Sequence, residues 1–179
     1  MKGIIFKLFE QTVVAAHGPD AWDDMLDECG FDGVYTSLGN YADADLVALV
    51  DALAARLGRP PDDVVRWLGR AAMPQLAKAH EEFFAAHTGT VSFLLTLNDI
   101  IHAEVRKLYD VALLPQFEFT VLPDGVDLAY RSARRLCSLA EGFVEGAADH
   151  FGEHVELSQP ECLKKGDERC LIRCRFSRS

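Results

Sequence analysis

Hydrophobic residues recur at helical spacing through the first 109 residues of the chain. Apolar side chains at every third or fourth position lie on one face of an α-helix, so this spacing predicts helices. The predicted helices cover residues 4–16, 19–30, 43–58, 60–87 and 91–109. Gly30 and Gly58 follow the last apolar positions of two of them, where glycine commonly ends a helix. Pro74 is expected to break or kink the fourth helix, because proline lacks the backbone N–H.

After residue 109 the hydrophobic period drops to two, which predicts strands. The predicted elements are a strand over 116–122, a turn at 123–125, a strand over 126–134, a helix over 134–152, and a closing hairpin with strands 154–163 and 168–176. We therefore expect an α+β fold with a helical N-terminal subdomain and a C-terminal antiparallel sheet that contains one inserted helix. The prediction is a single domain over residues 1–179, with two lobes that share one core.

Composition is ordinary for a soluble globular protein, with 49% hydrophobic and 26% charged residues. No apolar run approaches the ~18 residues of a membrane span. The first eleven residues, MKGIIFKLFEQ, have too short an apolar stretch for a signal peptide. We therefore expect a cytoplasmic protein that does not enter a membrane.

The net charge of −10 argues against nucleic acid as a partner, because an acidic surface repels phosphates. The basic C-terminal stretch RCLIRCRFSRS is better explained as a solvated strand edge. The sequence contains no GxSxG, no P-loop, no GxGxxG and no HExxH motif, and no pairing of nucleophile and base emerges. An enzyme is not predicted.

The stretch YRSAR places three polar side chains at alternate positions. On an extended strand Tyr130, Ser132 and Arg134 would share one face and form a row of hydrogen-bond donors. Carboxylates and phosphates suit such a row, since Arg can bind them bidentately. The alternative is a sheet face that turns from core to solvent, because Val126 and Leu128 precede the trio on the same face. On spacing alone the alternative is favoured.

His102 lies next to Ile101 on an amphipathic helix in the stretch NDIIHAEVRKLY. Taken alone, such a histidine is more often a core residue that hydrogen-bonds to a carbonyl than a ligand. The chain has no CxxCH motif, so any haem would not be attached covalently in the c-type manner.

Four of the five cysteines are expected to gather in the C-terminal half. Cys162 and Cys170 flank the predicted hairpin turn, and Cys174 shares a strand face with Cys170. Cys137, early in the inserted helix, would complete the four-thiolate tetrahedral set that structural zinc prefers. The sequence therefore predicts a possible zinc site.

Alternatives to the zinc site stay open at this stage. His154 or Glu161 could replace one thiolate ligand. The cysteines could also be buried reduced thiols or a reversible disulfide. Cys29, in the N-terminal half, is expected to be a packed thiol.

Several motifs occur in the order and spacing of a known family. They are MKGIIF at the start, the histidine in NDIIHAEVRKLY, LLPQF at 113–117 and YRSAR at 130–134. Over essentially its whole length, the chain resembles the haem–nitric oxide/oxygen binding (H-NOX) family, stand-alone bacterial type. That domain is related to the haem domain of soluble guanylate cyclase. The resemblance implies haem b bound non-covalently between a distal lobe, about residues 1–60, and a proximal lobe, about residues 61–179.

The resemblance also implies residue roles. His102 would be the proximal ligand of the haem iron. The haem propionates would be bound by Tyr130, Ser132 and Arg134. Pro115 would press against the porphyrin and distort it, with Ile5 contributing from the other side.

Gas selectivity is predicted from the distal pocket, whose hydrogen-bond donors select among diatomic ligands. Family members that hold oxygen stably have a tyrosine in the helix after Y-x-S-x-R, and the corresponding position here is about Leu139. No tyrosine follows Tyr130 in the sequence. An apolar distal wall is expected instead, formed by Phe9, Leu139 and Phe143 with Met73 or Leu76. We therefore predict binding of NO and CO without a stable O2 complex.

The resemblance implies an NO sensor in which NO binding breaks the bond between iron and His102 and shifts the lobes. A signalling partner, either a histidine kinase or a diguanylate cyclase/phosphodiesterase, would receive the change. Two alternatives remain. A haem enzyme such as a peroxidase would need a distal histidine or arginine. A cysteine/zinc thiol redox sensor, with or without haem, would respond to oxidation.

Overall fold

The computed structural model describes residues 1–108 and 114–178. Its helices are α1 (Gly3–His17), α2 (Pro19–Cys29), α3 (Asp43–Leu57), α4 (Pro61–Ala79), α5 (Glu81–Ala85), α6 (Thr90–Leu94), the π-helical turn η1 (Leu97–Ile101), α7 (His102–Leu108), α8 (Cys137–Phe151) and the 3-10 turn η2 (Leu163–Lys165). Within the described ranges, no helix is both long and apolar enough to span a membrane.

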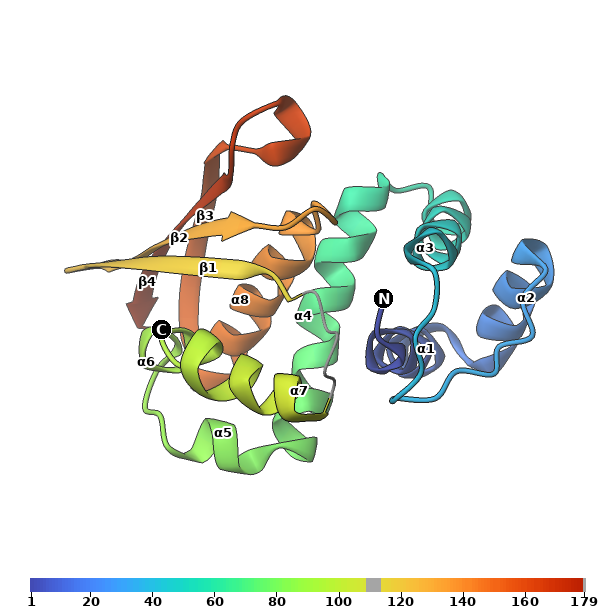
Figure 1. The fold of residues 1–179 in the computed structure, drawn as a ribbon, viewed down its shortest axis with the longest axis horizontal. Helices are drawn as coiled ribbons and strands as arrows, with labels where there is room; N and C mark the ends of the chain where they lie inside the picture. The colour runs from blue at the N-terminus through green and yellow to red at the C-terminus, as the bar shows by residue number, and fades with distance from the viewer. Residues whose placement is uncertain (109–113, 179) are drawn as a thin grey trace.

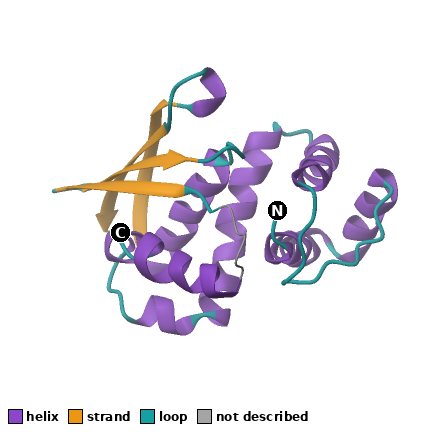
Figure 2. Cartoon of the chain, viewed as in Figure 1, coloured by secondary structure: helices purple, strands orange, loops and turns teal. Residues whose placement is uncertain are grey.

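Four strands form one antiparallel sheet in the order β1-β2-β4-β3. They are β1 (Gln116–Leu122), β2 (Gly125–Arg131), β3 (Glu153–Glu161) and β4 (Cys170–Arg178). The α+β class, with one helix inserted between two hairpins, is confirmed. Figures 1 and 2 show α1, α2 and α3 on one side of α4, and the sheet with α8 on the other.

The buried side chains form two clusters rather than the single shared core expected from the sequence. The N-terminal cluster includes Phe6, Met25 and Leu49, whereas the C-terminal cluster includes Leu128 and Ile172. Helix α4 serves both, because its 19 residues reach along roughly 28 Å. Burial on two sides of one long helix therefore organises the molecule into two lobes.

Helices α4 and α8 approach so closely that their contact requires glycine. A Cβ added at Gly142 would lie 2.0 Å from the carbonyl oxygen of Arg66, and one at Gly69 would lie 2.6 Å from that of Leu139. Two hydrogen bonds from Arg66 to Glu145, of 3.0 and 2.9 Å, bridge the same pair of helices. We call this contact the α4–α8 seam.

The expectation that Pro74 breaks the fourth helix is wrong. Helix α4 continues past Pro74 to Ala79, and a separate helix begins at Glu81. Pro74 is exposed, while Met73 and Ala77 beside it are buried. Packing of the inner face therefore maintains the helix despite the missing N–H.

The predicted helix over residues 91–109 is interrupted. The π-helical turn η1 separates α6 from α7, and the amide of Ile101 donates to the carbonyl of Thr96, five residues earlier, at 3.2 Å. The Asn98 side chain donates to the carbonyl of Phe117 at 2.6 Å, which fastens η1 to the start of β1. Such turns often occur at functional sites. Leu113 of the LLPQF motif lies outside the described residues.

Candidate functional site

A cavity of about 290 Å³ lies between the lobes. Its described lining comes from α1, α3, α4, α8, the loop before α8 and the turn η2: Ile5, Leu8, Phe9, Leu46, Val47, Val50, Asp51, Pro61, Asp62, Val65, Leu68, Ala72, Arg134, Arg135, Leu136, Leu139, Phe143 and Lys164. Five residues singled out from the sequence meet here, namely Ile5, Phe9, Arg134, Leu139 and Phe143. Met73 and Leu76 pack in the C-terminal cluster and are not part of this lining.

The cavity lining divides into an apolar part and a charged part. Aliphatic and aromatic side chains make up most of it. The charged part holds the cations Arg134, Arg135 and Lys164 and the carboxylates Asp51 and Asp62, of which Asp62 pairs with Lys164. Val47, at the cavity, is 55% exposed, so the space reaches solvent there. An apolar ligand that carries carboxylates suits this combination, since its body can be buried while its charges pair with arginine.

His102 is the first residue of α7, directly after the π-helical turn. Its ring stacks on Phe117 with centroids 5.6 Å apart. Nδ1 is buried and has no hydrogen-bond partner among the described residues. Burial, with a smaller contribution from Arg106, lowers the pKa of His102 to about 4. The imidazole is therefore neutral at pH 7 and able to donate a lone pair to a metal.

Pro115 lies immediately before β1, two residues ahead of the Phe117 ring that His102 stacks on. It is partly buried. The strand start therefore brings Pro115 into the same part of the fold as His102.

Tyr130 is buried, 3% exposed, near the end of β2. Its hydroxyl oxygen accepts the N–H of Leu136 at 3.1 Å, and its ring lies 5.6 Å from that of Phe117. Burial raises the pKa of Tyr130, so it keeps its proton at neutral pH. The phenol can therefore act as a donor.

Ser132 and Arg134 do not lie on the strand, and the argument from alternation along an extended strand is wrong for them. Strand β2 ends at Arg131. The chain then turns, with the Ser132 hydroxyl accepting the N–H of Arg134 at 3.2 Å. Arg135 has a φ of 52°, which is unusual for a residue other than glycine. This turn places Arg134 at the cavity.

A partner of Arg134 in the N-terminal lobe was not predicted from the sequence. Nε of Arg134 donates to Oδ2 of Asp43, the first residue of α3, at 2.8 Å. Asp43 also accepts a hydrogen bond from the α-amino group of Met1 at 2.6 Å. The only signal in the sequence is an acidic residue where a helix begins, which is too common to indicate this contact.

Three of the four predicted cysteine ligands come together. The sulfur atoms of Cys137, Cys162 and Cys170 all lie within 4.8 Å of one another, and those of Cys137 and Cys162 are 3.9 Å apart. All three side chains are buried. Burial raises the pKa of Cys170 to about 12, although the N–H of Leu163, which donates to its sulfur at 3.3 Å, acts in the opposite direction. We call these three residues the thiol cluster.

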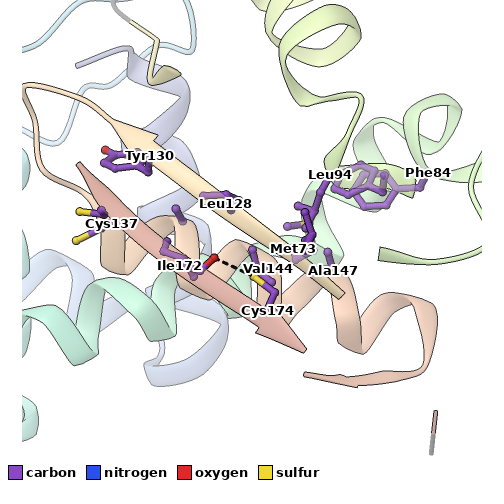
Figure 3. Packing of buried hydrophobic residues seen from close by; sticks show 14 of the residues in the cluster. Met73, Phe84, Leu94, Leu128, Tyr130, Cys137, Val144, Ala147, Ile172 and Cys174 are labelled. Atoms are coloured by element: carbon purple, nitrogen blue, oxygen red, sulfur yellow. Dashed lines mark hydrogen bonds between the residues drawn. The ribbon is translucent and has the colours of Figure 1, made fainter. Parts of the chain in front are cut away.

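Cys174 does not join the thiol cluster, so its assignment as a zinc ligand is corrected. Figure 3 shows it near Val144 and away from Cys137. Four residues along a strand span roughly 13 Å, which is too far for a shared ion although Cys170 and Cys174 face the same side. Among the described residues, neither His154 nor Glu161 lies in the cluster. The carboxylate of Glu161 instead pairs with Arg169 at 2.9 Å.

Comparison with known proteins identifies the family. Residues 2–159 match the family described as haem-NO-binding. The chain belongs to this family. The family resemblance inferred from the sequence is thereby confirmed.

Solved structures of this family agree with the fold. An H-NOX protein from Shewanella oneidensis in the Fe(II) state, carrying three substitutions, is 35% identical, with a TM-score of 0.92 over 100% of this chain and 97% of that one. The same organism's H-NOX protein in the Fe(II)NO state is 36% identical, with a TM-score of 0.91 over 99% of both chains. An H-NOX protein from K. algicida is 24% identical, with a TM-score of 0.87 over 100% of this chain and 98% of that one, and shares the fold. No curated protein matches the chain.

Proposed function

We propose that this chain binds haem b non-covalently, with His102 as the protein ligand of the iron. The observation that carries the proposal is the partly buried, neutral imidazole of His102, whose buried Nδ1 has no partner among the described residues. A buried polar atom of this kind is costly unless a ligand or neighbouring group satisfies it. Haem iron, when bound, would supply a coordination site for diatomic gases. The similar Shewanella structures in the Fe(II)NO and Fe(II)CO states support this choice of cofactor.

Tyr130, Ser132 and Arg134 are proposed to bind the haem propionates. Arg134 lines the cavity, and the buried phenol of Tyr130 adjoins the same turn through Leu136. A guanidinium and a hydroxyl suit carboxylates. On this proposal Pro115 and Ile5 contact the porphyrin and distort it from opposite sides.

The ligands are proposed to be NO and CO, without a stable O2 complex. Leu139 lines the cavity together with Phe9 and Phe143. It lies at about the position where family members that hold oxygen have a tyrosine. Oxygen bound to iron carries partial negative charge and gains more from a nearby hydrogen-bond donor than NO does. The described cavity lining contains no tyrosine and no histidine. An apolar wall therefore favours NO and CO over O2.

The conformational change is proposed to start at His102. NO binding would release the imidazole from iron, and the short segment η1–α7 would then lose one of its attachments. Asn98 and the His102 ring both fasten this segment to Phe117. The lobes would rearrange as a ligand-biased two-state change. The output is proposed to regulate a histidine kinase or a diguanylate cyclase/phosphodiesterase, so the chain acts as a sensor rather than an enzyme.

Visible absorption spectra test the proposal directly. The ferrous protein is recorded under argon and then under CO, NO and air. We expect a haem spectrum with distinct CO and NO forms and no stable oxygenated form in air. A Leu139→Tyr variant is the matched comparison, and a slower loss of O2 in that variant would support the distal-wall argument. A wild-type protein that takes up no haem, or that holds O2 stably, would contradict the proposal.

The thiol cluster supports a second candidate function, a zinc or thiol redox site. Three buried thiols within 4.8 Å match three corners of a tetrahedral zinc site, with the fourth ligand from outside this set. In the redox alternative, Cys137 and Cys162 would form a disulfide, losing two protons and two electrons to an oxidant such as peroxide. Their sulfur atoms, 3.9 Å apart, would have to approach to about 2.05 Å.

Metal content and thiol reactivity distinguish a zinc site from a redox-active disulfide. Protein purified with zinc present is expected to contain about one zinc per chain if the cluster is a metal site. Substitution of Cys137 with Ser should abolish this zinc, whereas Cys174→Ser should not. Absence of zinc together with unchanged thiol titration after mild peroxide would remove both forms of this candidate.

A further inference from the structure

A row of aromatic side chains connects the wall of the cavity with the surface of the N-terminal lobe. Phe9 of α1 lines the cavity, and the centroid of its ring lies 5.7 Å from that of Trp22 in α2. The ring of Trp22 lies 6.4 Å from that of Tyr35, which in turn lies 4.9 Å from that of Tyr41. Phe9 and Trp22 are buried, whereas the two tyrosines are partly exposed. We call Trp22, Tyr35 and Tyr41 the aromatic chain.

The aromatic chain differs in redox chemistry from the phenylalanine next to it. Tryptophan and tyrosine lose one electron far more readily than phenylalanine does. An electron also moves rapidly between such rings when they are in contact, and the ring separations here are those of packed aromatic pairs. Phe9 therefore bridges the cavity and Trp22, and from Trp22 outward each ring can hold a missing electron.

The two tyrosines can release a proton together with an electron. Burial, followed by the negative charges of Asp45 and Asp32, raises the pKa of Tyr35 to about 12, so its phenol is protonated at neutral pH. The same carboxylates are bases that can take up the proton when the ring is oxidised. The hydroxyl of Tyr41 donates to the carbonyl of Val34 at 3.2 Å, which restrains its ring beside Tyr35.

We propose that the aromatic chain passes electrons from the surface to the cavity when peroxide attacks the bound haem, and so protects the cofactor and its protein ligands from oxidation. The proposal rests on the haem-binding function proposed above. Reduction of one peroxide to two waters consumes two electrons and two protons. Tyr35 and Tyr41 each supply one electron and one phenolic proton and become neutral phenoxyl radicals. External thiols then restore them by donating hydrogen atoms.

Trp22 is the relay in this scheme. It loses an electron toward the cavity and regains one from Tyr35, so it is unchanged at the end. The role is protection of the cofactor rather than peroxidase turnover, because the oxidised groups are side chains of the protein itself.

The aromatic chain also packs the N-terminal cluster, so the variants must separate packing from electron transfer. Tyr35→Phe keeps the ring and its stacking on Phe6, with centroids 4.5 Å apart, but removes the readily oxidised phenol. Trp67→Phe is the matched control for Trp22→Phe, because Trp67 is the other tryptophan of the sequence and its ring lies against His17. Thermal unfolding of each apoprotein shows whether a variant is folded.

Radical trapping tests the proposal in the ferric haem protein. The protein is treated with hydrogen peroxide and a spin trap, and peptide mass spectrometry locates the trapped radicals. We expect adducts at Tyr35 and Tyr41 in the wild type and in Trp67→Phe. Trp22→Phe should lose most of both adducts, and its haem should bleach faster. An unchanged Tyr41 adduct in Trp22→Phe, or adducts confined to Tyr130, overturns the proposal.

A measurement without haem keeps failure of this inference apart from failure of the proposed function. In apoprotein that carries Trp67→Phe, a laser flash ionises Trp22, the only tryptophan left, and transient absorption follows its radical. We expect this radical to decay as a tyrosyl radical forms, at a rate independent of protein concentration, and Tyr35→Phe should slow the transfer.

The outcomes of the flash experiment are distinct. A tryptophan radical that decays without forming a tyrosyl radical overturns the aromatic chain whether or not haem binds, and so does an unchanged rate in Tyr35→Phe. A wild-type chain that takes up no haem overturns the proposed function, whatever the apoprotein shows.

Discussion

The α4–α8 seam and the segment that carries His102 are built in contrasting ways. At the seam, backbones meet at Gly69 and Gly142, and arginine–carboxylate bonds cross between the helices. The His102 segment is a short π-helical turn with no buried residue, followed by a short helix, and Asn98 fastens it to Phe117. The α4–α8 seam is therefore a rigid frame for the cavity wall. The His102 segment, in contrast, can detach from its neighbours at a small cost in free energy.

The largest expected effect comes from replacing His102 with Gly. This removes the proposed iron ligand, so normal haem ligation should be lost and should return when imidazole is added to the protein. His102 is only partly buried at the start of a short helix, so glycine there should lower the apoprotein's free energy of unfolding by only about 1 kcal/mol. Absorption spectra and urea titration measure the two effects. A variant with normal ligation and no response to imidazole would end the assignment.

Gly142→Ala tests the seam. The added methyl would lie 2.0 Å from the Arg66 carbonyl oxygen, so the helices must separate. We expect the free energy of unfolding to fall by about 3 kcal/mol, which chemical denaturation of the apoprotein measures. Lys78→Ala, on the exposed side of α4, is the control and should change it by less than about 0.5 kcal/mol. An unchanged midpoint for Gly142→Ala would mean that the seam is not a rigid contact.

Acidification should expose the cost of burying His102. Its pKa is about 4 in the folded chain against an ordinary 6.5, so the unfolded chain binds the proton more readily. Stability is therefore present above the unfolded pKa and lost as the pH falls from 6.5 toward 4. By pH 5 the apoprotein should lose up to about 2 kcal/mol through this residue. The His102→Gln variant should not lose this part of its stability on acidification, which urea titration at several pH values measures. The same dependence of unfolding free energy on pH in the variant and the wild type would contradict the argument from burial.

Asn98→Ala should have the smallest effect. It removes the 2.6 Å hydrogen bond to the Phe117 carbonyl, which contributes about 1 kcal/mol. Amide exchange over residues 97–102 should speed by roughly fivefold, since the opening of this segment becomes easier by that amount. Asp99→Asn, in the same turn but exposed, serves as the control. Equal exchange in the two variants would show that Asn98 does not hold the segment.

Much of the fold could be predicted from local patterns. The change of hydrophobic period near residue 109 separates the helical half from the sheet, and Gly30, Gly58 and Gly152 end helices with φ between 61° and 70°. Steric rules at glycine act within a few residues, so they can be read from the sequence. The π-helical turn could not, because it depends on a contact between Asn98 and a strand 19 residues away.

The candidate site was predicted in part. The family motif led to His102 and the Tyr130, Ser132 and Arg134 trio, but the trio's arrangement by a turn after Arg131 was not expected. Strand alternation is a local rule, and it fails once the strand ends. The thiol cluster was predicted with one ligand too many, because sharing a strand face does not bring Cys174 close to Cys170.

The sequence by itself determined the α+β class, the helix ends at glycine and the choice of residues that can bind iron, carboxylates or zinc, since these follow from side-chain chemistry and short-range backbone sterics. Only the tertiary structure decided that the core splits into two clusters along α4, that three thiols meet, and that Asp43 holds Arg134. These features depend on which surfaces are buried together, and burial is a property of the packed chain rather than of any one segment.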